Sequence, residues 1–256
     1  MKYSQRLEIM AQEVFPKDRV IDVGSDHGYL PLLLWEKFPG SRVVVSDISP
    51  GSLNKAKENI GARLTFEQEQ EWVSYRLGSG LSVVSPGEVN VAVIGGMGGV
   101  LITEILEKSL EMAKEMDRFI LQPRNGQGKL RYWLSQNGFQ IQREHLAKEG
   151  KFICEILIVV PTWECSNPVE WSSGNEIQFE VPEHLLEVQE KEWVEPFLRG
   201  KLEIENGIRM ALGTGESPDL AKAVETDNRI LYLEGLIQRW EEQHGRMETG
   251  VAGNIK

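Results

Sequence analysis

The feature that most constrains this chain is a strand, a glycine loop, a helix and a second strand near its start. The first part reads Val-Ile-Asp-Val-Gly-Ser-Asp-His-Gly-Tyr at positions 20–29, and the second reads Val-Val-Val-Ser-Asp at positions 43–47. In an open parallel sheet, ligands bind beyond the carboxyl ends of the strands, and a carboxylate that ends the second strand can hold ribose hydroxyls. The pattern predicts an α/β domain with a site for a nucleotide-like ligand.

The loop between the first strand and its helix indicates which ligand fits. It has the form Gly-x-x-x-Gly, with Gly24 and Gly28, and lacks the Gly-x-Gly-x-x-Gly pattern that lets backbone amides close on a pyrophosphate. It also carries Asp26, and a fixed anion repels phosphates. These residues favour a cofactor with a ribose and a positive centre but no phosphate, which is S-adenosylmethionine (SAM).

Residues 1–160 are expected to form one domain of alternating strands and helices. The strands are expected at Arg19–Val23, Arg42–Asp47, Trp72–Leu77, Val89–Ile94, Phe119–Gln122, Phe139–Leu146 and Lys151–Val160. Helices are expected at Ser4–Glu13, from Pro31 to about Phe38, and at Pro50–Ile60, Val100–Met116 and Gly128–Gln136. Only residues 147–150 join the last two strands, so these strands form an antiparallel hairpin, because parallel strands need a longer crossover.

That hairpin selects the fold class. A dinucleotide-binding sheet is wholly parallel, whereas a parallel sheet with an antiparallel last strand is the Rossmann-like fold of class I SAM-dependent methyltransferases. Residues 161–256 are expected to form a linker (161–182) and a C-terminal helical, coiled-coil-like domain. In that domain, helices at 182–212 and 219–243 would pack as an antiparallel pair, and 245–256 would fray. The pairing is indicated by a heptad-like seam of Ile230, Leu233, Ile237 and Trp240.

Charge is unevenly distributed along the chain. The net charge is −11, but residues 1–160 hold 19 Lys+Arg against 20 Asp+Glu, and residues 118–151 hold 7 against 2. Binding a polyanion depends on such a local basic patch, so RNA remains a possible partner. The chain has no secretory signal and no long apolar stretch, and no metal-ligand spacing among its four histidines and two cysteines. We expect a cytoplasmic monomer without a metal or a membrane partner.

Three consecutive strand ends supply the candidate cofactor site. Asp47 is assigned to the ribose hydroxyls, the loop from Gly24 to Gly28 to the methionine end, and the backbone from Gly78 to Gly80 to the adenine. The full set of predicted cofactor-binding residues is Asp22, Gly24, Ser25, His27, Gly28, Asp47, Ile48, Gly78, Ser79, Gly80, Gly95 and Gly96. A glycine-rich turn without a ligand is the alternative for any one of these loops taken alone.

The fourth strand is followed by Gly-Gly-Met-Gly-Gly at positions 95–99, which allows the backbone to approach a flat ligand closely. Enzymes that methylate an exocyclic amine usually carry an Asp/Asn-Pro-Pro-aromatic cluster at this point. Its absence favours a ring nitrogen as the methyl acceptor. A flexible turn before a helix is the structural alternative.

Residues after the fifth strand could bind RNA. Amides and a guanidinium at Gln122, Arg124 and Asn125 suit a base edge or a phosphate, although turns favour the same residue types. The predicted RNA-binding residues are Arg6, Gln122, Arg124, Asn125, Lys129 and Arg131. Tyr29 could stack on a flipped base or simply pack the start of its helix.

Four segments resemble the bacterial TrmK family. They are Ser4–Leu7, Asp22–Pro31, Gly95–Gly99 and Leu121–Pro123. The family methylates N1 of adenine 22 in tRNA, so the resemblance implies SAM as cofactor, tRNA as substrate and a helical C-terminal domain. One departure is Ser79, because similar proteins usually have Asp between these glycines, where it could reach the cofactor's adenine.

The implied reaction needs positioning more than base catalysis, because adenine N1 is neutral and carries an in-plane lone pair. The predicted catalytic residues are Asp26, which would accept from the N6 amino group, and Tyr29 and Met97, which would lie against the base. Two alternatives stay open: a SAM-dependent methyltransferase acting on a small molecule or a protein, and a non-catalytic SAM-binding protein, which the departure at Ser79 would favour.

Overall fold

The computed structural model describes residues 3–25, 27–162, 172, 175–213 and 219–249. The chain divides into two compact units, Met1–Val169 and Glu170–Lys256. The predicted boundary at 160/161 lies close to this division, but the segment 163–171 lies outside the described residues. In the part of the chain that the structure describes, no helix is long and apolar enough to cross a membrane.

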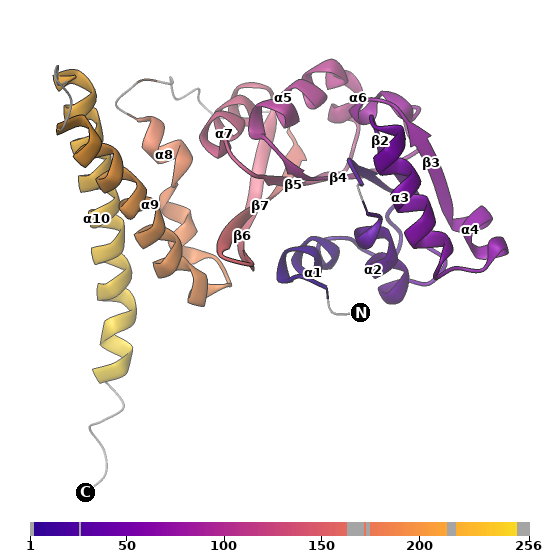
Figure 1. Cartoon of the computed structure of the whole chain (residues 1–256), viewed down its shortest axis with the longest axis horizontal. Helices are drawn as coiled ribbons and strands as arrows, with labels where there is room; N and C mark the ends of the chain where they lie inside the picture. Colours follow the sequence, from indigo (N-terminus) through magenta and orange to yellow (C-terminus); the bar gives the residue numbers. More distant parts are fainter. Residues whose placement is uncertain (1–2, 26, 163–171, 173–174, 214–218, 250–256) are drawn as a thin grey trace, which may run out of the picture. The chain divides into compact units, whose positions relative to one another are not determined.

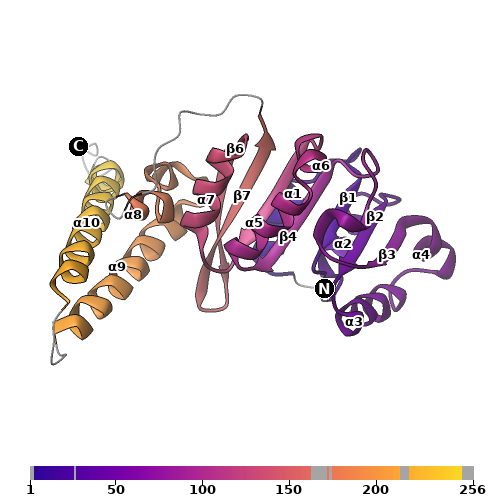
Figure 2. The same ribbon diagram turned by 90° about the horizontal axis from the view of Figure 1, so that it is seen from above.

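A seven-stranded sheet forms the first unit, with the strand order β3-β2-β1-β4-β5-β7-β6. The strands are β1 (Val20–Val23), β2 (Val43–Asp47), β3 (Val73–Leu77), β4 (Val91–Met97), β5 (Arg118–Pro123), β6 (Phe139–Glu149) and β7 (Phe152–Pro161). The first five strands pair in parallel, and β7 pairs antiparallel with both β5 and β6. Figure 2 shows the strands following one another from β6 to β3. The predicted fold class, with its antiparallel last strand, is confirmed.

Helices cover both faces of the sheet (Figure 1). The helices of one face are α1 (Gln5–Gln12), α2 (Tyr29–Lys37) and α3 (Pro50–Gly61), and those of the other are η1 (Gly80–Val83), α5 (Gly99–Lys108), α6 (Leu110–Lys114) and α7 (Gln127–Gln136). Successive side chains of a strand point to opposite faces of the sheet, so one strand contributes to the core on both faces. In β2, Val43 and Val45 pack toward the first face, whereas Val44 packs toward the second. The strands are therefore buried on both sides, as their continuous apolar runs require.

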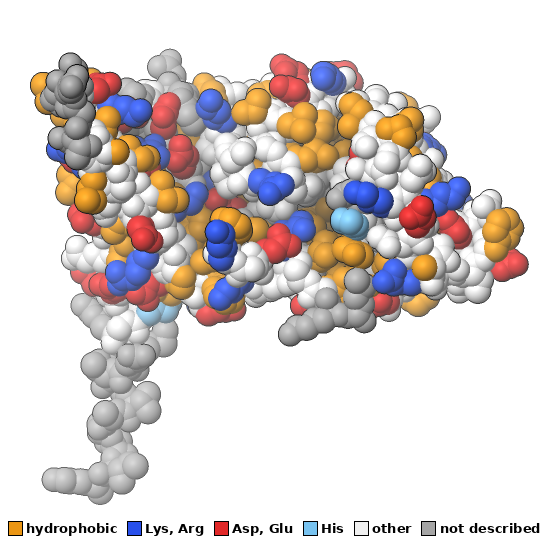
Figure 3. Space-filling view, viewed as in Figure 1, with side chains coloured by type: hydrophobic (Ala, Val, Ile, Leu, Met, Phe, Trp, Pro, Cys, Tyr) orange, Lys and Arg blue, Asp and Glu red, His pale blue; other side chains and the backbone are white. Residues whose placement is uncertain are grey.

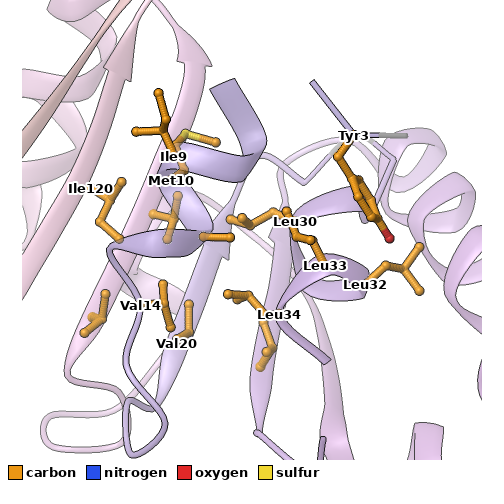
Figure 4. Packing of buried hydrophobic residues seen from close by; sticks show 14 of the residues in the cluster. Tyr3, Ile9, Met10, Val14, Val20, Leu30, Leu32, Leu33, Leu34 and Ile120 are labelled. Atoms are coloured by element: carbon orange, nitrogen blue, oxygen red, sulfur yellow. The ribbon is translucent and has the colours of Figure 1, made fainter. Parts of the chain in front are cut away.

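The N-terminal helix α1 is part of this core. Figure 4 shows Ile9, Met10 and Val14 beside Val20 of β1 and Ile120 of β5. Ser4 caps the helix, since its Oγ accepts a hydrogen bond from Leu7 N at 3.4 Å. Packing of this apolar face fixes the position of α1, and with it the polar side chains that α1 carries toward the strand ends.

The helices of the first unit differ from the sequence prediction at two places. The single helix expected over 100–116 is divided at Ser109 into α5 and α6. A further helix, α4 (Phe66–Trp72), begins with a capping box between Thr65 and Gln68. It has no fully buried residue, so it gives no apolar periodicity from which it could be predicted.

The second unit consists of helices. They are α8 (Glu176–Glu180), η2 (Glu183–Glu187), α9 (Lys191–Gly213) and α10 (Leu220–Thr249). Two ion pairs join α9 and α10. Arg199, in the first half of α9, pairs with Glu241 in the second half of α10, and Arg209, near the end of α9, pairs with Asp227 in the first half of α10. The two helices are therefore antiparallel, as predicted.

The details of the second unit differ from the sequence prediction. Three of the four predicted seam residues are buried, namely Leu233, Ile237 and Trp240. Ile230 is only partly buried, whereas Leu236, which was not part of the predicted seam, is buried. The predicted linker contains α8, the first long helix starts at Lys191 rather than Pro182, and α10 continues to Thr249 where fraying was expected from 245. The remaining terminal residues, 250–256, lie outside the described residues.

Candidate active site

A pocket opens at the carboxyl ends of β1 and β4. These strands are neighbours, and the chain order reverses there, which is the position where open α/β sheets bind ligands. The pocket has a volume of about 280 Å³ and is lined by Arg6, Leu7, Met10, Asp22, Gly24, Ser25, His27, Gly28, Tyr29, Leu30, Gly95, Gly96 and Arg124. On the face drawn in Figure 3, Lys and Arg side chains lie near a histidine and hydrophobic side chains between α1, α2 and β4. The structure thus brings seven of the twelve predicted cofactor-binding residues to one pocket, whereas Asp47, Ile48 and the turn from Gly78 to Gly80 are not among its lining residues.

The loop after β1 is tied to the neighbouring strand. Both Gly24 N and Ser25 N donate to Ser46 O, at 2.8 and 3.1 Å. Gly24 and Gly28 have φ of 74° and 66°, a region that favours glycine. Ser25 Oγ is buried and forms no hydrogen bond of ordinary geometry among the described residues, although it lies close enough to Asp22 to lower the pKa of that carboxyl. A buried hydroxyl of this kind at a pocket wall is a group that a polar ligand can satisfy.

Asp22 is a buried carboxyl beneath this loop. Desolvation by burial raises the pKa of Asp22 to about 6, against the opposing effects of Ser25 and Arg6, and the Asp47 carboxylate adds to the rise. A buried anionic group with a raised pKa is stabilised when a cation binds beside it. Asp22 therefore suits the ammonium of an amino-acid ligand.

Asp47 ends β2 and is held by the start of the next helix. Its Oδ1 accepts a hydrogen bond from Ser49 N at 2.7 Å. A carboxylate has about four acceptor positions, so this bond leaves capacity for ribose hydroxyls. Next to it, Ile48 is 74% exposed and Leu77 is 57% exposed, and Leu77 is the partner of Asp47 in the parallel register of β2 and β3. A carboxylate beside two exposed apolar side chains suits a nucleoside.

Leu77 was not predicted from the sequence. The available signal was an apolar residue at the end of a strand, directly before a Gly-x-Gly turn. That signal is weak on its own, because single exposed apolar residues are common at protein surfaces.

The turn from Gly78 to Gly80 has a packing role. A Cβ on Gly78 would lie 2.4 Å from Val83 Cγ1, and one on Gly80 would lie 2.6 Å from Ile105 Cγ2. Ser79 is exposed, and its carbonyl accepts from Ser82 Oγ at 2.6 Å. These glycines are explained by close packing, and contact of this turn with the cofactor remains a prediction.

At the end of β4 the glycine segment forms a bulge between Gly95 and Met97. Gly96 has φ of 77°, and a Cβ built on it would meet no atom within 4 Å. Met97 folds onto the loop after β1, because a Cβ on Gly24 would lie 2.2 Å from its Cε. The backbone at Gly96 is therefore open to a ligand, whereas Met97 packs between two of the loops that form the site.

Arg6 and Gln122 form a network that the sequence did not indicate. Gln122 Oε1 accepts from Gly96 N at 3.0 Å and from Arg6 Nη1 at 3.2 Å. Arg6 Nε also forms an ion pair with Glu149 Oε2 at 2.8 Å. Gln122 is only 2% exposed. The structure therefore places Gln122 as a support for Arg6 and Gly96, out of reach of direct contact with RNA.

The predicted basic residues divide into two groups. Arg124, Asn125 and Lys129 are exposed, and Arg124 lines the pocket. Arg131 is 4% exposed and forms ion pairs with Glu144 and with Glu155, at 2.5 and 2.6 Å. The prediction that Arg131 contacts RNA is wrong, because the side chain is enclosed between α7 and the hairpin.

Aromatic rings lie at the rim of the pocket. His27 is exposed, and its ring stacks on Tyr29 with a centroid distance of 5.3 Å. Asp26, the predicted acceptor for N6, lies outside the described residues. No group of three or more His, Cys, Asp or Glu suited to a metal ion is present in the described part of the chain.

Comparison with known proteins identifies the family. A family model described as "Methyltransferase domain" matches residues 3–157. The chain belongs to this family. Its match to the tRNA (adenine(22)-N(1))-methyltransferase of Bacillus subtilis (strain 168) is 32% identical over 159 residues, which is 62% of this chain and 65% of the relative. The matched region thus spans less than two thirds of that relative's length.

Solved structures of this methyltransferase type extend the comparison to the helical unit. Streptococcus pneumoniae Sp1610 has a TM-score of 0.76 and 29% identity, covering 92% of this chain and 100% of that one. The same protein in complex with S-adenosyl-L-methionine has a TM-score of 0.74 and 28% identity, with coverage of 92% and 100%. The resemblance to the TrmK family is confirmed.

The Streptococcus pneumoniae protein binds SAM, and the residues present at the corresponding strand ends of this chain fit the same ligand. Asp22 and the buried Ser25 hydroxyl match the polar methionine end, whereas Asp47 with Ile48 and Leu77 matches the nucleoside. The loop from Gly24 to Gly28 holds no Lys or Arg that could neutralise a diphosphate.

Proposed function

We propose that this protein transfers the methyl group of SAM to N1 of adenine 22 in tRNA. The observation that carries the proposal is the site at the strand ends: the pocket, together with Asp47 at the end of β2, suits SAM, and the pocket wall holds Gly95 and Gly96 where exocyclic-amine methyltransferases have a Pro-Pro cluster. The Bacillus subtilis relative with this activity supports the choice of substrate.

The residues of the chain act mainly by positioning. When bound, SAM supplies an electrophilic methyl group on a sulfonium centre. Asp47 holds the ribose, and Asp22 with Ser25 holds the methionine end. Gly96 lets the target base approach the backbone closely, and Tyr29 stacks against the base. Adenine N1 needs no strong base, so a histidine or lysine poised as a general base is not required.

Positive charge at the pocket suits the polyanionic substrate. Arg6 is fixed by Gln122 and Glu149, and Arg124 is exposed at the rim. These side chains are placed to meet phosphates near the target nucleotide. Three expectations stay predictions from the sequence: that Asp26 accepts from N6, that the protein is cytoplasmic and that it is a monomer.

The test is methylation of two matched transcripts with labelled SAM. One is an unmodified tRNA transcript with adenine at position 22, and the other carries guanine there. We expect label only in the first, with reverse transcription stopping at position 22, because a methyl group on N1 blocks base pairing. Equal label in both transcripts, or label in the protein or a small molecule, would refute the proposal and favour one of the other classes of acceptor.

A further inference from the structure

The turn of the β6–β7 hairpin extends beyond the other strand ends at the pocket. Leu121 of β5 pairs with Leu157 of β7. Beyond Leu121, β5 has only two more residues before it ends at Pro123. In the same direction, β7 has five residues beyond Leu157, from Ile156 back to Phe152, because the two strands are antiparallel. The hairpin therefore projects past the end of β5 by about three residues, roughly 10 Å at the rise of a strand.

Strand alternation decides which face the tip presents. Phe152 and Ile156 point to the same side of β7, because they are an even number of residues apart. Ile156 packs in the core cluster that contains Met10 of α1. Across the hairpin, Glu149 is the partner of Phe152, and it forms the 2.8 Å ion pair with Arg6. Phe152 thus lies on the face of the sheet that carries α1 and the wall of the pocket.

The tip combines an exposed aromatic ring with cations. Phe152 is 65% exposed, and Lys151 Nζ lies 5.3 Å from its ring centroid. Lys148 on the opposite strand is exposed as well. The acidic residue of the tip, Glu149, is engaged by Arg6. Aromatic rings beside basic side chains are the composition that single-stranded or splayed nucleic acid binds, through stacking and phosphate contacts.

The hairpin is also held in a defined position. Lys148 N donates to Gln5 Oε1 at 2.8 Å, so α1 is bonded to the hairpin through both Gln5 and Arg6. Gly150 adopts φ of 61°, which permits the two-residue turn. A fixed arm binds RNA without the entropic cost of ordering a loop.

We propose that this turn is an RNA-binding arm: Phe152 stacks on a nucleobase neighbouring the target adenine, and Lys151 contacts an adjacent phosphate. The proposal rests on the proposed function, since it takes tRNA as the ligand. It adds a binding surface outside the pocket and assigns the exposed Phe152 ring to the nucleotides that flank the methylated base.

The test compares binding of the unmodified tRNA transcript to the Phe152→Ala and Phe66→Ala variants. Phe66 is a matched control, because it is 71% exposed and lies at the start of α4, which leads into the opposite, amino end of β3. Loss of stacking is worth about 1–3 kcal/mol, so Phe152→Ala should weaken tRNA binding roughly 5- to 150-fold. Phe152→Trp should retain wild-type binding, and Lys151→Gln should lower the salt dependence of log K by about 0.7–0.9.

SAM affinity, measured by calorimetry, separates an RNA contact from a structural effect. It should be unchanged in all of these variants. Equal tRNA binding by Phe152→Ala and Phe66→Ala would overturn the proposal, and so would a loss of SAM affinity that matches the loss of tRNA affinity. Failure of the wild-type protein to methylate adenine 22 would instead refute the proposed function, and it is read from the methylation assay rather than from these binding data.

Discussion

Replacement of Asp22 by asparagine tests the electrostatics of the pocket. Burial raises the pKa of Asp22 from 3.8 to about 6, so the folded protein binds this proton more tightly than the unfolded chain does. Stability is then lost as pH rises from about 4 to about 6, and it stays lower above that range. A difference of about two pKa units corresponds to about 3 kcal/mol. Asparagine carries no charge, so Asp22→Asn should remove this loss.

The assay is urea unfolding of both proteins without SAM between pH 4 and pH 8. The free energy of unfolding of Asp22→Asn should equal that of the wild type near pH 4 and exceed it by up to about 3 kcal/mol at pH 8. SAM binding provides a second readout. The ionised carboxylate favours the ammonium of SAM, so wild-type affinity should rise from pH 5 to pH 7, and the variant should bind more weakly without that rise. A stability difference that does not change with pH would refute the reasoning.

Two further predictions concern the loops and the core. Gly28→Ala should destabilise the protein by more than Gly87→Ala: both glycines have positive φ, 66° and 74°, but only at Gly28 would the added Cβ meet neighbours, the buried Ile60 side chain at 2.8 Å and Ala56 O at 3.3 Å, and thermal unfolding of the two variants measures the difference. Arg131→Met should lower the free energy of unfolding by about 3–5 kcal/mol, because it leaves two buried carboxylates without their cation. Arg199→Met, which removes two exposed ion pairs, should leave the denaturation midpoint nearly unchanged. Equal effects of the two arginine substitutions would contradict this account of the buried cluster.

Much of the fold could be predicted because its signals are local. Continuous apolar runs such as 43–45 mark strands that are buried on both faces, and a join as short as the one predicted at 147–150 requires an antiparallel hairpin. In the structure the turn is shorter still, residues 150–151, because β6 continues to Glu149. The loop from Gly24 to Gly28 and Asp47 at the end of β2 likewise follow from residues close together in the chain. The short helix α4 could not be predicted, because it buries no complete side chain and has no apolar stripe.

The parts of the site that could not be predicted depend on distant contacts. Arg6 and Gln122 are 116 residues apart in the chain, and only the packing of α1 on the sheet brings them together. Arg131 belongs to the basic stretch 118–151, but its acidic partners come from β6 and β7. A count of charges along the chain does not distinguish a buried ion pair from an exposed cation, and for this reason Arg131 was wrongly assigned to RNA.

The most direct test of the central claim is calorimetric titration with SAM of the wild type, Asp47→Ala and Asp117→Ala. Asp117 is a matched control, since it precedes β5 at the opposite edge of the sheet, where it accepts a hydrogen bond from Asn90 at 2.7 Å. Hydrogen bonds to a charged group contribute about 1.5–3 kcal/mol, so Asp47→Ala should weaken SAM binding roughly 10- to 150-fold while Asp117→Ala matches the wild type. NADH should not displace SAM from the wild type. Unchanged SAM affinity in Asp47→Ala, or displacement of SAM by NADH, would contradict the assignment of these strand ends to SAM.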